Sequence, residues 1–225
     1  SELDAIVTSC LAKDPNDRPA DFGVVLDQLS HVFQRQTGKP PPSPPAGPTL
    51  TAFELCNKGA SLTGLGKTEA AVGYLERAVK LCPLDELSWV NLGGAYHASG
   101  KYEAAEKCYA RALRIQPKYP AALHNLGLTR LSQRRQEEAI ELFEAALRRD
   151  PFSLETIVEL GRAMNASGDR EKAVFWFAHA LEVAPTSTRA INAYAAFLTD
   201  CGDHQGAFRL YERSLAINDR QENVW

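Results

Sequence analysis

No run of apolar residues in this chain reaches the length that a membrane-spanning helix needs, and no signal-peptide pattern is present. Neither sign of charge dominates, because 25 basic and 28 acidic residues give a formal net charge of −3. A basic stripe is missing as well, and such a stripe is the usual footprint of nucleic-acid binding. We therefore expect no membrane partner and no nucleic-acid partner.

Cysteine is sparse. The five cysteines include no CxxC pair and their number is odd, and the five histidines show no metal-ligand spacing relative to them. Free thiols in a reducing compartment are the simplest interpretation, which predicts a cytoplasmic protein. Cys56, Cys82 and Cys108 lie within helical patterns, where we expect cysteine to pack as a small apolar side chain.

A fixed period runs through most of the sequence. Prolines recur at equal intervals, at Pro83, Pro117, Pro151 and Pro185. Self-similarity at such a period is typical of stacked helix pairs. Counting back from each proline gives five units of equal length, which are 52–85, 86–119, 120–153, 154–187 and 188–221.

Residue sizes follow the same register. Alanine recurs at one place in every unit, and a large residue follows four positions later: Leu75, Tyr109, Phe143, Phe177 and Tyr211. Glycine recurs in the first half of four units, at Gly59, Gly93, Gly127 and Gly161. Small residues let two helices approach closely while large ones fill the space between them. A second glycine, which is suited to end the first helix, is replaced in the third unit by Arg134, so we expect a different turn geometry there.

This pattern resembles the tetratricopeptide repeat over residues 52–221. The resemblance implies an all-α, right-handed superhelical solenoid of helix-turn-helix repeats. It also implies a concave groove, lined by the first helices, that binds peptide segments of other proteins. Trp225 stands in register with Trp89, so residues 222–225 are predicted to start a truncated sixth repeat or to form a cap.

Residues 3–29 resemble the C-terminal end of a Ser/Thr protein kinase domain, through Cys10-Leu11, Asp14-Pro15, Arg18-Pro19, Phe22 and Leu29. Residues 1–36 are accordingly predicted to be the remnant of a kinase-like domain. The alternative is a helical cap on the repeats. Residues 37–51 are rich in proline, which predicts an extended linker because proline cannot continue a helix.

Two apparent catalytic motifs lack the context that their chemistry needs. Asp21-Phe22-Gly23 spells the metal-binding triplet of kinases, but it follows Arg18-Pro19 and not a catalytic loop. Residues 61–68 are similar to the sequence motif of a phosphate-binding loop, but they lack its first glycine and no strand precedes them. We therefore expect a turn between helices there. We predict no enzyme, catalytic residue, metal or cofactor in this fragment, with ATP and magnesium implied only for the missing kinase domain.

Candidate binding residues lie on the first helix of each unit. Asn57, Asn91 and Asn125 recur at one position, which holds Glu159 and Ala193 in the last two units. An asparagine amide can donate to a peptide carbonyl and accept from a peptide N–H, so the ladder can hold an extended peptide. It is similar to the asparagine ladder of O-linked N-acetylglucosamine transferase, with a local preference for asparagine as the alternative. The other candidates are Phe53, Leu87, Val90, His97, His124, Leu128, Arg162 and Arg189, and the two arginines are expected to pair with Glu155 or Glu159.

The sequence therefore predicts a scaffold that binds protein or peptide segments, as the regulatory or recruitment part of a Ser/Thr protein kinase. Two alternatives stay open at this point. One is a stand-alone adaptor without a kinase, and the other is the repeat arm of a glycosyltransferase-like enzyme. Self-association of the repeats is a further alternative.

Overall fold

The computed structural model describes residues 22–38 and 50–222. The chain divides into two compact units, residues 1–49 and 50–225. In the first unit, the helix α2 spans Phe22–Thr37. The predicted kinase-like residues 3–21, with Asp21 and Cys10 among them, lie outside the described residues, and so does most of the proline-rich segment.

The second unit consists of five successive helix pairs. Their bounds are α3 Ala52–Gly64 and α4 Thr68–Leu81, α5 Glu86–Ala98 and α6 Tyr102–Ile115, α7 Pro120–Ser132 and α8 Gln136–Leu147, α9 Leu154–Ala166 and α10 Arg170–Val183, and α11 Thr188–Asp200 and α12 His204–Glu222. The first helices of successive pairs begin at equal intervals along the chain, and this interval is the same as the one that separates the prolines.

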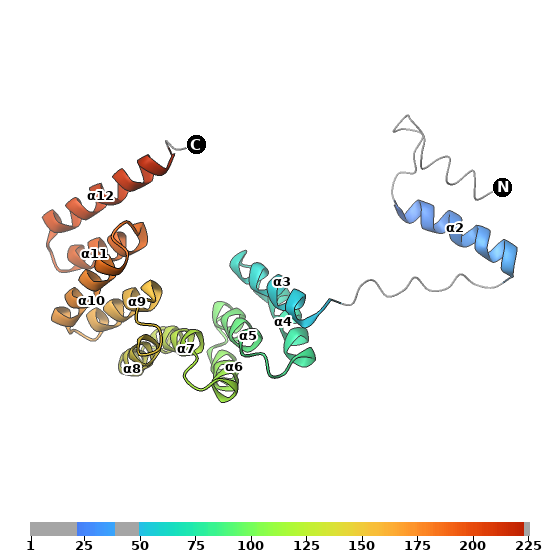
Figure 1. The fold of residues 1–225 in the computed structure, drawn as a ribbon, viewed down its shortest axis with the longest axis horizontal. Coiled ribbons are helices and arrows are strands. Elements are labelled where there is room, and N and C mark those ends of the chain that lie inside the picture. Colours follow the sequence, from blue (N-terminus) through green and yellow to red (C-terminus); the bar gives the residue numbers. More distant parts are fainter. Residues whose placement is uncertain (1–21, 39–49, 223–225) are drawn as a thin grey trace. The chain divides into compact units, whose positions relative to one another are not determined.

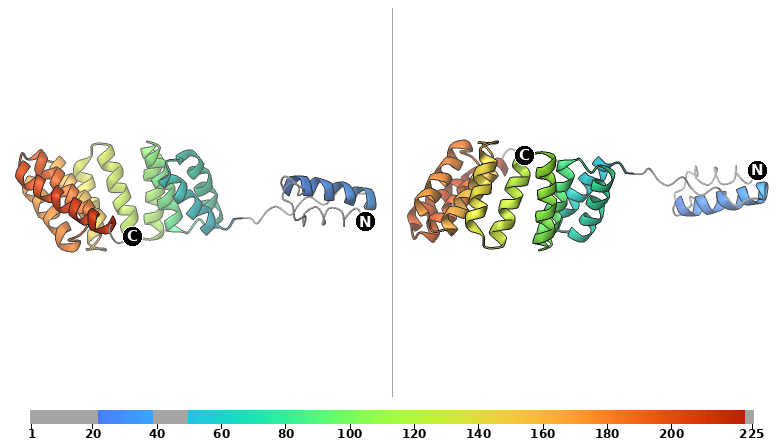
Figure 2. Two further views of the ribbon diagram at one scale, coloured as in Figure 1. Left: turned by 90° about the horizontal axis from the view of Figure 1, so that it is seen from above. Right: turned by 90° about the horizontal axis from the view of Figure 1, so that it is seen from below.

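The pairs stack on one another in chain order (Figure 2). Each helix packs on its partner in the pair, and each second helix packs on the first helix of the next pair. The stack is curved, with α5, α7 and α9 on the inner side and α6 and α8 on the outer side (Figure 1). The described part of the chain contains helices and no strand, which confirms the prediction of an all-α solenoid.

The core of each of the first four pairs is a ring or branched side chain pressed against a glycine, whereas the fifth pair has Ala195 and a Tyr211 that is 39% exposed. Tyr109, Phe143 and Phe177 are almost completely buried. A Cβ atom on Gly93 would lie only 2.4 Å from the Tyr109 ring, and one on Gly127 would lie 2.7 Å from the Phe143 ring. Real Cβ atoms do not come so close to other carbons. The small and large positions of the repeat are thus one feature, because the glycine makes room for the ring.

The turn inside the third pair corrects one expectation from the sequence. Arg134 stands where the other pairs have glycine, and its φ is 61°, as positive as the 72° of Gly100. Its hydrogen bonds are also the same: Arg134 N donates to Leu131 O at 2.9 Å, as Gly100 N donates to His97 O at 2.9 Å. The predicted difference in turn geometry was wrong, since the packing of the two helices imposes the left-handed conformation whatever residue is there.

Arg134→Gly is expected to raise the free energy of unfolding by about 1 kcal/mol, because a left-handed conformation costs a residue with a Cβ roughly 1–2 kcal/mol and costs glycine little. Urea denaturation followed by circular dichroism measures this change. Arg134→Ala is the control, since it removes the side chain and keeps the strain. Equal stability of the glycine and alanine variants would contradict the explanation.

The turns between pairs contain the periodic prolines and end the second helices. Three of the second helices, α4, α6 and α10, end two residues before a proline, whereas α8 already ends at Leu147, four residues before Pro151. The last helix behaves differently. The repeat register predicts that α12 ends near residue 217, but it continues to Glu222, because Asp219 occupies the place where proline would recur. Residues 223–225 lie outside the described residues.

The four cysteines in the described ranges are unpaired. Cys56 and Cys108 are buried, as predicted, and burial raises the pKa of the Cys108 thiol to about 11, with a smaller contribution from the charge of Glu76. The prediction was wrong for Cys82, which is exposed because it caps the end of α4 and does not lie within it. Burial keeps the thiol of Cys108 in its protonated, unreactive form.

Candidate functional site

The asparagine ladder runs along the inner helices, and its exposure falls along the array. Asn57 is exposed, while Asn91 and Asn125 are half-buried. The same position is buried in the last two pairs, where Glu159 is 8% and Ala193 is 4% exposed. The ladder can therefore contact a ligand only over the first three pairs.

The amide groups of the two central asparagines are partly used inside the array. Asn91 Nδ2 donates to Cys56 Sγ at 3.1 Å, which links α5 to α3. Asn125 Nδ2 donates to the carbonyl oxygen of Ala121 at 2.8 Å, within its own helix. The amide oxygen of neither residue receives a hydrogen bond from the described part of the chain. Because each Nδ2 carries a second N–H, these asparagines still offer a ligand the amide oxygen and one N–H, although one donor of each is already used inside the array.

The two candidate histidines join neighbouring pairs. His97 Nδ1 lies 3.0 Å from Thr129 Oγ1, and His124 Nδ1 lies 3.0 Å from Thr156 Oγ1. The Thr129 hydroxyl donates its single proton to the carbonyl oxygen of Asn125 at 2.9 Å. The Thr129 oxygen must then accept from His97, so this imidazole carries its proton on Nδ1. Both histidines are half-buried and act as links between repeats.

Burial lowers the pKa of His97. Burial is also the main cause of the lowered pKa of His124, where Arg189 adds to the effect while Glu159 and Glu155 oppose it. The folded-state values thus lie below the unfolded value of about 6.5. The stability that the neutral imidazoles contribute is complete above that pH and is lost as the pH falls toward the folded-state values.

We expect the urea midpoint of the wild type to fall between pH 7.5 and pH 5.0 by more than that of a His97→Gln, His124→Gln double variant. The variant cannot lose the contribution of two neutral imidazoles, and glutamine still offers an amide to the threonines. The exposed His204 supplies the control, because His204→Gln should leave the wild-type pH dependence unchanged. An equal fall in the double variant and the wild type would contradict the assignment.

The charged candidates pair with one another, as the sequence predicted. Arg162 Nη1 lies 3.1 Å from Glu159 Oε1, and Arg189 lies 3.4 Å from Glu159 and 3.7 Å from Glu155. The Glu159 side chain is only 11% exposed, so it needs these cations to compensate its charge. The two arginines are therefore engaged with α9 itself.

The apolar candidates differ in accessibility. Phe53 is 70% and Leu87 is 43% exposed, so both are open to a ligand. Leu128 is half-buried against the core around Phe143. Val90 is 5% exposed and belongs to the core with Tyr109, which removes it from the groove surface. The periodicity alone did not separate Val90 from Leu87, because both lie near the boundary between the buried and the inner faces.

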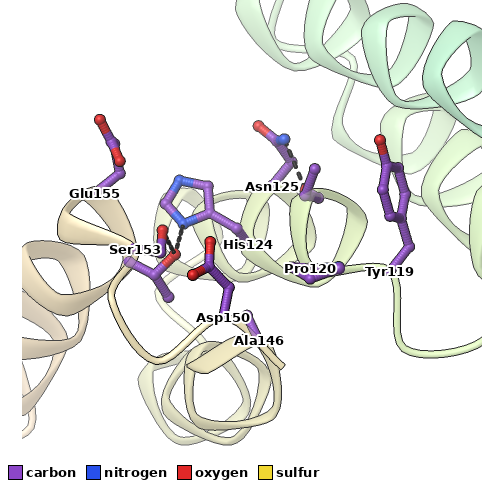
Figure 3. Close-up of a pocket in the computed structure, with 10 residues that line it drawn as sticks. Tyr119, Pro120, His124, Asn125, Ala146, Asp150, Ser153 and Glu155 are labelled. Carbon is purple, nitrogen blue, oxygen red and sulfur yellow. Dashed lines mark hydrogen bonds between the residues drawn. The ribbon is translucent and has the colours of Figure 1, made fainter. Parts of the chain in front are cut away.

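A pocket of about 350 Å³ opens beside His124 and Asn125, between the N-terminal parts of α7 and α9 (Figure 3). Its lining comes from the turn before α7, from α7 itself, and from the end of α8 through the start of α9: Tyr119, Pro120, Ala121, His124, Asn125, Ala146, Asp150, Ser153, Glu155 and Thr156. The sequence predicted only His124 and Asn125 of this set. Of the other polar residues, Tyr119, Asp150 and Ser153 lie in the turns that precede the inner helices, and Glu155 and Thr156 lie in the first turn of α9. This position in the repeat is the signal that would have indicated them.

The remaining sequence motifs carry no chemistry in the described residues. Residues 61–68 form the end of α3, a turn and the start of α4, as predicted for a turn between helices. No group of three or more histidine, cysteine, aspartate or glutamate residues in ranges 22–38 and 50–222 is arranged to hold a metal ion. None of the helices described for this chain combines the length and the apolar composition that crossing a bilayer requires.

Two sequence profiles of the tetratricopeptide repeat match the chain, over residues 85–151 and 130–197. The helix pairs are tetratricopeptide repeats. A third profile, the bacterial transcriptional activator domain, matches residues 49–117 and so overlaps the first two pairs of the tetratricopeptide array. No curated protein matches the sequence.

Solved structures share the fold at low sequence identity. TTC0263, a thermophilic TPR protein of Thermus thermophilus, is 20% identical with a TM-score of 0.69, over 77% of this chain and 95% of that one. PilF of Pseudomonas aeruginosa is 19% identical with a TM-score of 0.65, over 73% and 75%. YrrB, described as a TPR protein with an unusual peptide-binding site, is 17% identical with a TM-score of 0.53, over 74% and 86%. Identities this low establish the likeness of the tetratricopeptide folds alone.

Proposed function

We propose that the tetratricopeptide array is a scaffold that binds extended segments of other proteins along the inner helices α3, α5 and α7. The observation that carries this proposal is the row of asparagines whose amide oxygens are unused within the described chain, beside a pocket at α7 and α9. Peptide N–H groups are the natural partners of such acceptors. The exposed Phe53 and Leu87 add apolar surface at the start of the row.

Selection from a random peptide library displayed on phage tests the scaffold function. The full chain should retain a set of peptides that the Asn91→Ala, Asn125→Ala double variant retains at least ten-fold less. Gln205→Ala is the control, because it removes an exposed amide from α12, a second helix. Circular dichroism must show that the double variant is folded. Equal retention by the folded double variant and the wild type would refute peptide binding at the ladder.

We further propose that the array serves the recruitment or regulation of a Ser/Thr protein kinase in the cytoplasm. The support is the resemblance of residues 3–29 to the end of a kinase domain, together with the unpaired cysteines. A stand-alone adaptor fits the described residues equally well. The gene sequence upstream of Ser1 decides between them, since a glycine-rich loop and an H-R-D motif would establish the kinase and their absence would remove it.

A further inference from the structure

The pocket between α7 and α9 is lined by two carboxylates and by no lysine or arginine. We propose that it binds the ammonium or guanidinium group of a lysine or arginine side chain that belongs to a protein segment in the groove. The inference rests on the proposed peptide-binding function and specifies the chemistry of the ligand. A volume of about 350 Å³ is at the small end for ligand pockets, which suits one long side chain better than several.

The hydrogen-bonding groups that remain free in the pocket are mostly acceptors. Asn125 donates one of its two Nδ2 hydrogens to Ala121, which leaves the amide oxygen and one N–H. His124 Nδ1 and the Ser153 hydroxyl both bond to Thr156 Oγ1, so these three polar groups largely satisfy one another. The carboxylates of Asp150 and Glu155 and the Asn125 oxygen are acceptors only, and they lie beside a second Asn125 N–H, the Tyr119 hydroxyl and His124 Nε2. The two carboxylates carry the negative charge of the lining, and lysine and arginine are the side chains that carry only donors.

Asp150 is the main anchor. Its carboxylate is exposed and makes no ion pair or side-chain hydrogen bond with the described part of the chain. Glu155 is weaker, because Arg189 lies 3.7 Å away and compensates part of its charge. In Figure 3, Asp150 lies in the space beside His124, on the side of Pro120 and Tyr119. An aspartate without a partner in a pocket is a place where an incoming cation gains a charge-assisted hydrogen bond.

The other charges that act on the pocket residues are mostly negative, and the exception is Arg189, whose charge reaches His124 and Glu155. Burial raises the pKa of Tyr119, and the negative charges of Glu86 and Asp85 raise it further, so the negative potential extends to the opposite wall of the pocket. His124 adds no positive charge at neutral pH, because burial lowers its pKa. An acidic ligand side chain would meet only like charges on the lining, and like charges brought together in this way disfavour binding.

The array already holds one guanidinium with the same kinds of groups. Arg130 is 14% exposed and lies between Glu106 and Glu138, with its Nη1 donating to Gln133 Oε1 at 3.0 Å. Two carboxylates and one amide oxygen thus surround this guanidinium. The pocket offers the same kinds of groups in Asp150, Glu155 and Asn125, and no lysine or arginine lines it, although Arg189 lies 3.7 Å from Glu155.

This combination occurs at one junction of the array. Asp150 corresponds to Cys82, Gln116 and Ala184 in the other turns, none of which is acidic. Glu155 corresponds to Phe53, Leu87, Ala121 and Arg189 in the other first helices. The basic residue of a bound segment is therefore expected at a fixed place, opposite the junction of the third and fourth pairs.

Sequences selected from the phage library test the inference. Peptides retained by the wild type should share a lysine or arginine at one aligned position, and selection on Asp150→Asn should lose that preference. The Asp150 side chain is exposed and makes no hydrogen bond or ion pair with the described part of the chain, so this variant is expected to fold as the wild type does. Glu141→Gln, which removes an exposed carboxylate from α8 outside the pocket, should keep the preference.

One selected peptide is then synthesised with arginine, or with the uncharged analogue citrulline, at the shared position. Calorimetry should show at least ten-fold weaker binding of the citrulline peptide to the wild type, and less than a two-fold difference between the two peptides with Asp150→Asn. The inference is overturned if the selected peptides share no basic position, or if Asp150→Asn and wild type discriminate equally. Neither result affects the scaffold function, which fails only if no peptide depends on Asn91 and Asn125.

Discussion

Gly93→Ala is expected to lower the free energy of unfolding by about 2 kcal/mol, because the added methyl group overpacks a filled core. The new Cβ would lie 2.4 Å from Cε1 of Tyr109 and within 2.8 Å of two more ring atoms. The ring is completely buried, so it cannot move aside without displacing its neighbours. Overpacking of this kind costs roughly 1–3 kcal/mol or more, and the better helix propensity of alanine offsets about 1 kcal/mol. Urea denaturation measures the change.

Gly94 provides the matched control in the same helix. A Cβ atom there would meet nothing within 4 Å, so Gly94→Ala should stabilise the array by roughly 0.5–1 kcal/mol through helix propensity alone. Gly161→Ala should fall between the two, because its Cβ would lie 3.1 Å from the Phe177 ring. If Gly93→Ala and Gly94→Ala shift stability in the same direction, the explanation for the periodic glycine is wrong.

Arg130→Met is expected to lower the free energy of unfolding by about 2 kcal/mol, because it leaves a partly buried carboxylate without its cation. Arg130 joins Glu106 of the second pair to Glu138 of the third, and its side chain is 14% exposed. Burial alone would raise the pKa of Glu106, but the hydrogen bonds and charge of Arg130, with help from Gln133 and Arg135, lower it overall. An uncompensated charge costs several kcal/mol when burial is complete and less here, because Glu106 is 25% exposed.

Two comparisons separate the charge of Arg130 from its packing. Arg135→Met breaks an exposed pair with Glu138 and should change stability by less than about 0.5 kcal/mol. The double variant Arg130→Met, Glu106→Met should recover most of the loss, since both charges are then gone. A double variant as unstable as Arg130→Met would show that the packing of the arginine, and not its charge, holds the two pairs together.

The fold could be predicted from the sequence because it depends on local rules that repeat. Gly93 makes room for the ring of Tyr109, and Gly127 makes room for the ring of Phe143. Any helix pair of this kind must meet this steric requirement. Arg134 shows where such reasoning stops. The preference of this turn position for glycine predicted a different turn geometry at Arg134. The free energy of packing the two helices, however, exceeds the roughly 1–2 kcal/mol that the left-handed conformation costs.

The candidate site could be predicted only in part. The positions of Asn91 and Asn125 on the inner helices follow from the register, but their hydrogen bonds do not, because Asn91 reaches Cys56 in the preceding pair. Asp150 could not be selected from the sequence, since its role depends on which neighbours leave its carboxylate without a partner. The contacts among side chains of different pairs are not periodic, and they decide what the groove offers to a ligand.

Each pair contacts little beyond the pairs before and after it. The array therefore has no single shared core whose loss would unfold all of the pairs at once. Unfolding in such a chain is expected to start at its ends and to progress one unit at a time. The lining of the pocket comes from the third and fourth pairs and from the turn before α7. A segment bound in the pocket would contact both of these pairs at once, so it is expected to oppose their separation and to couple the unfolding of one to that of the other.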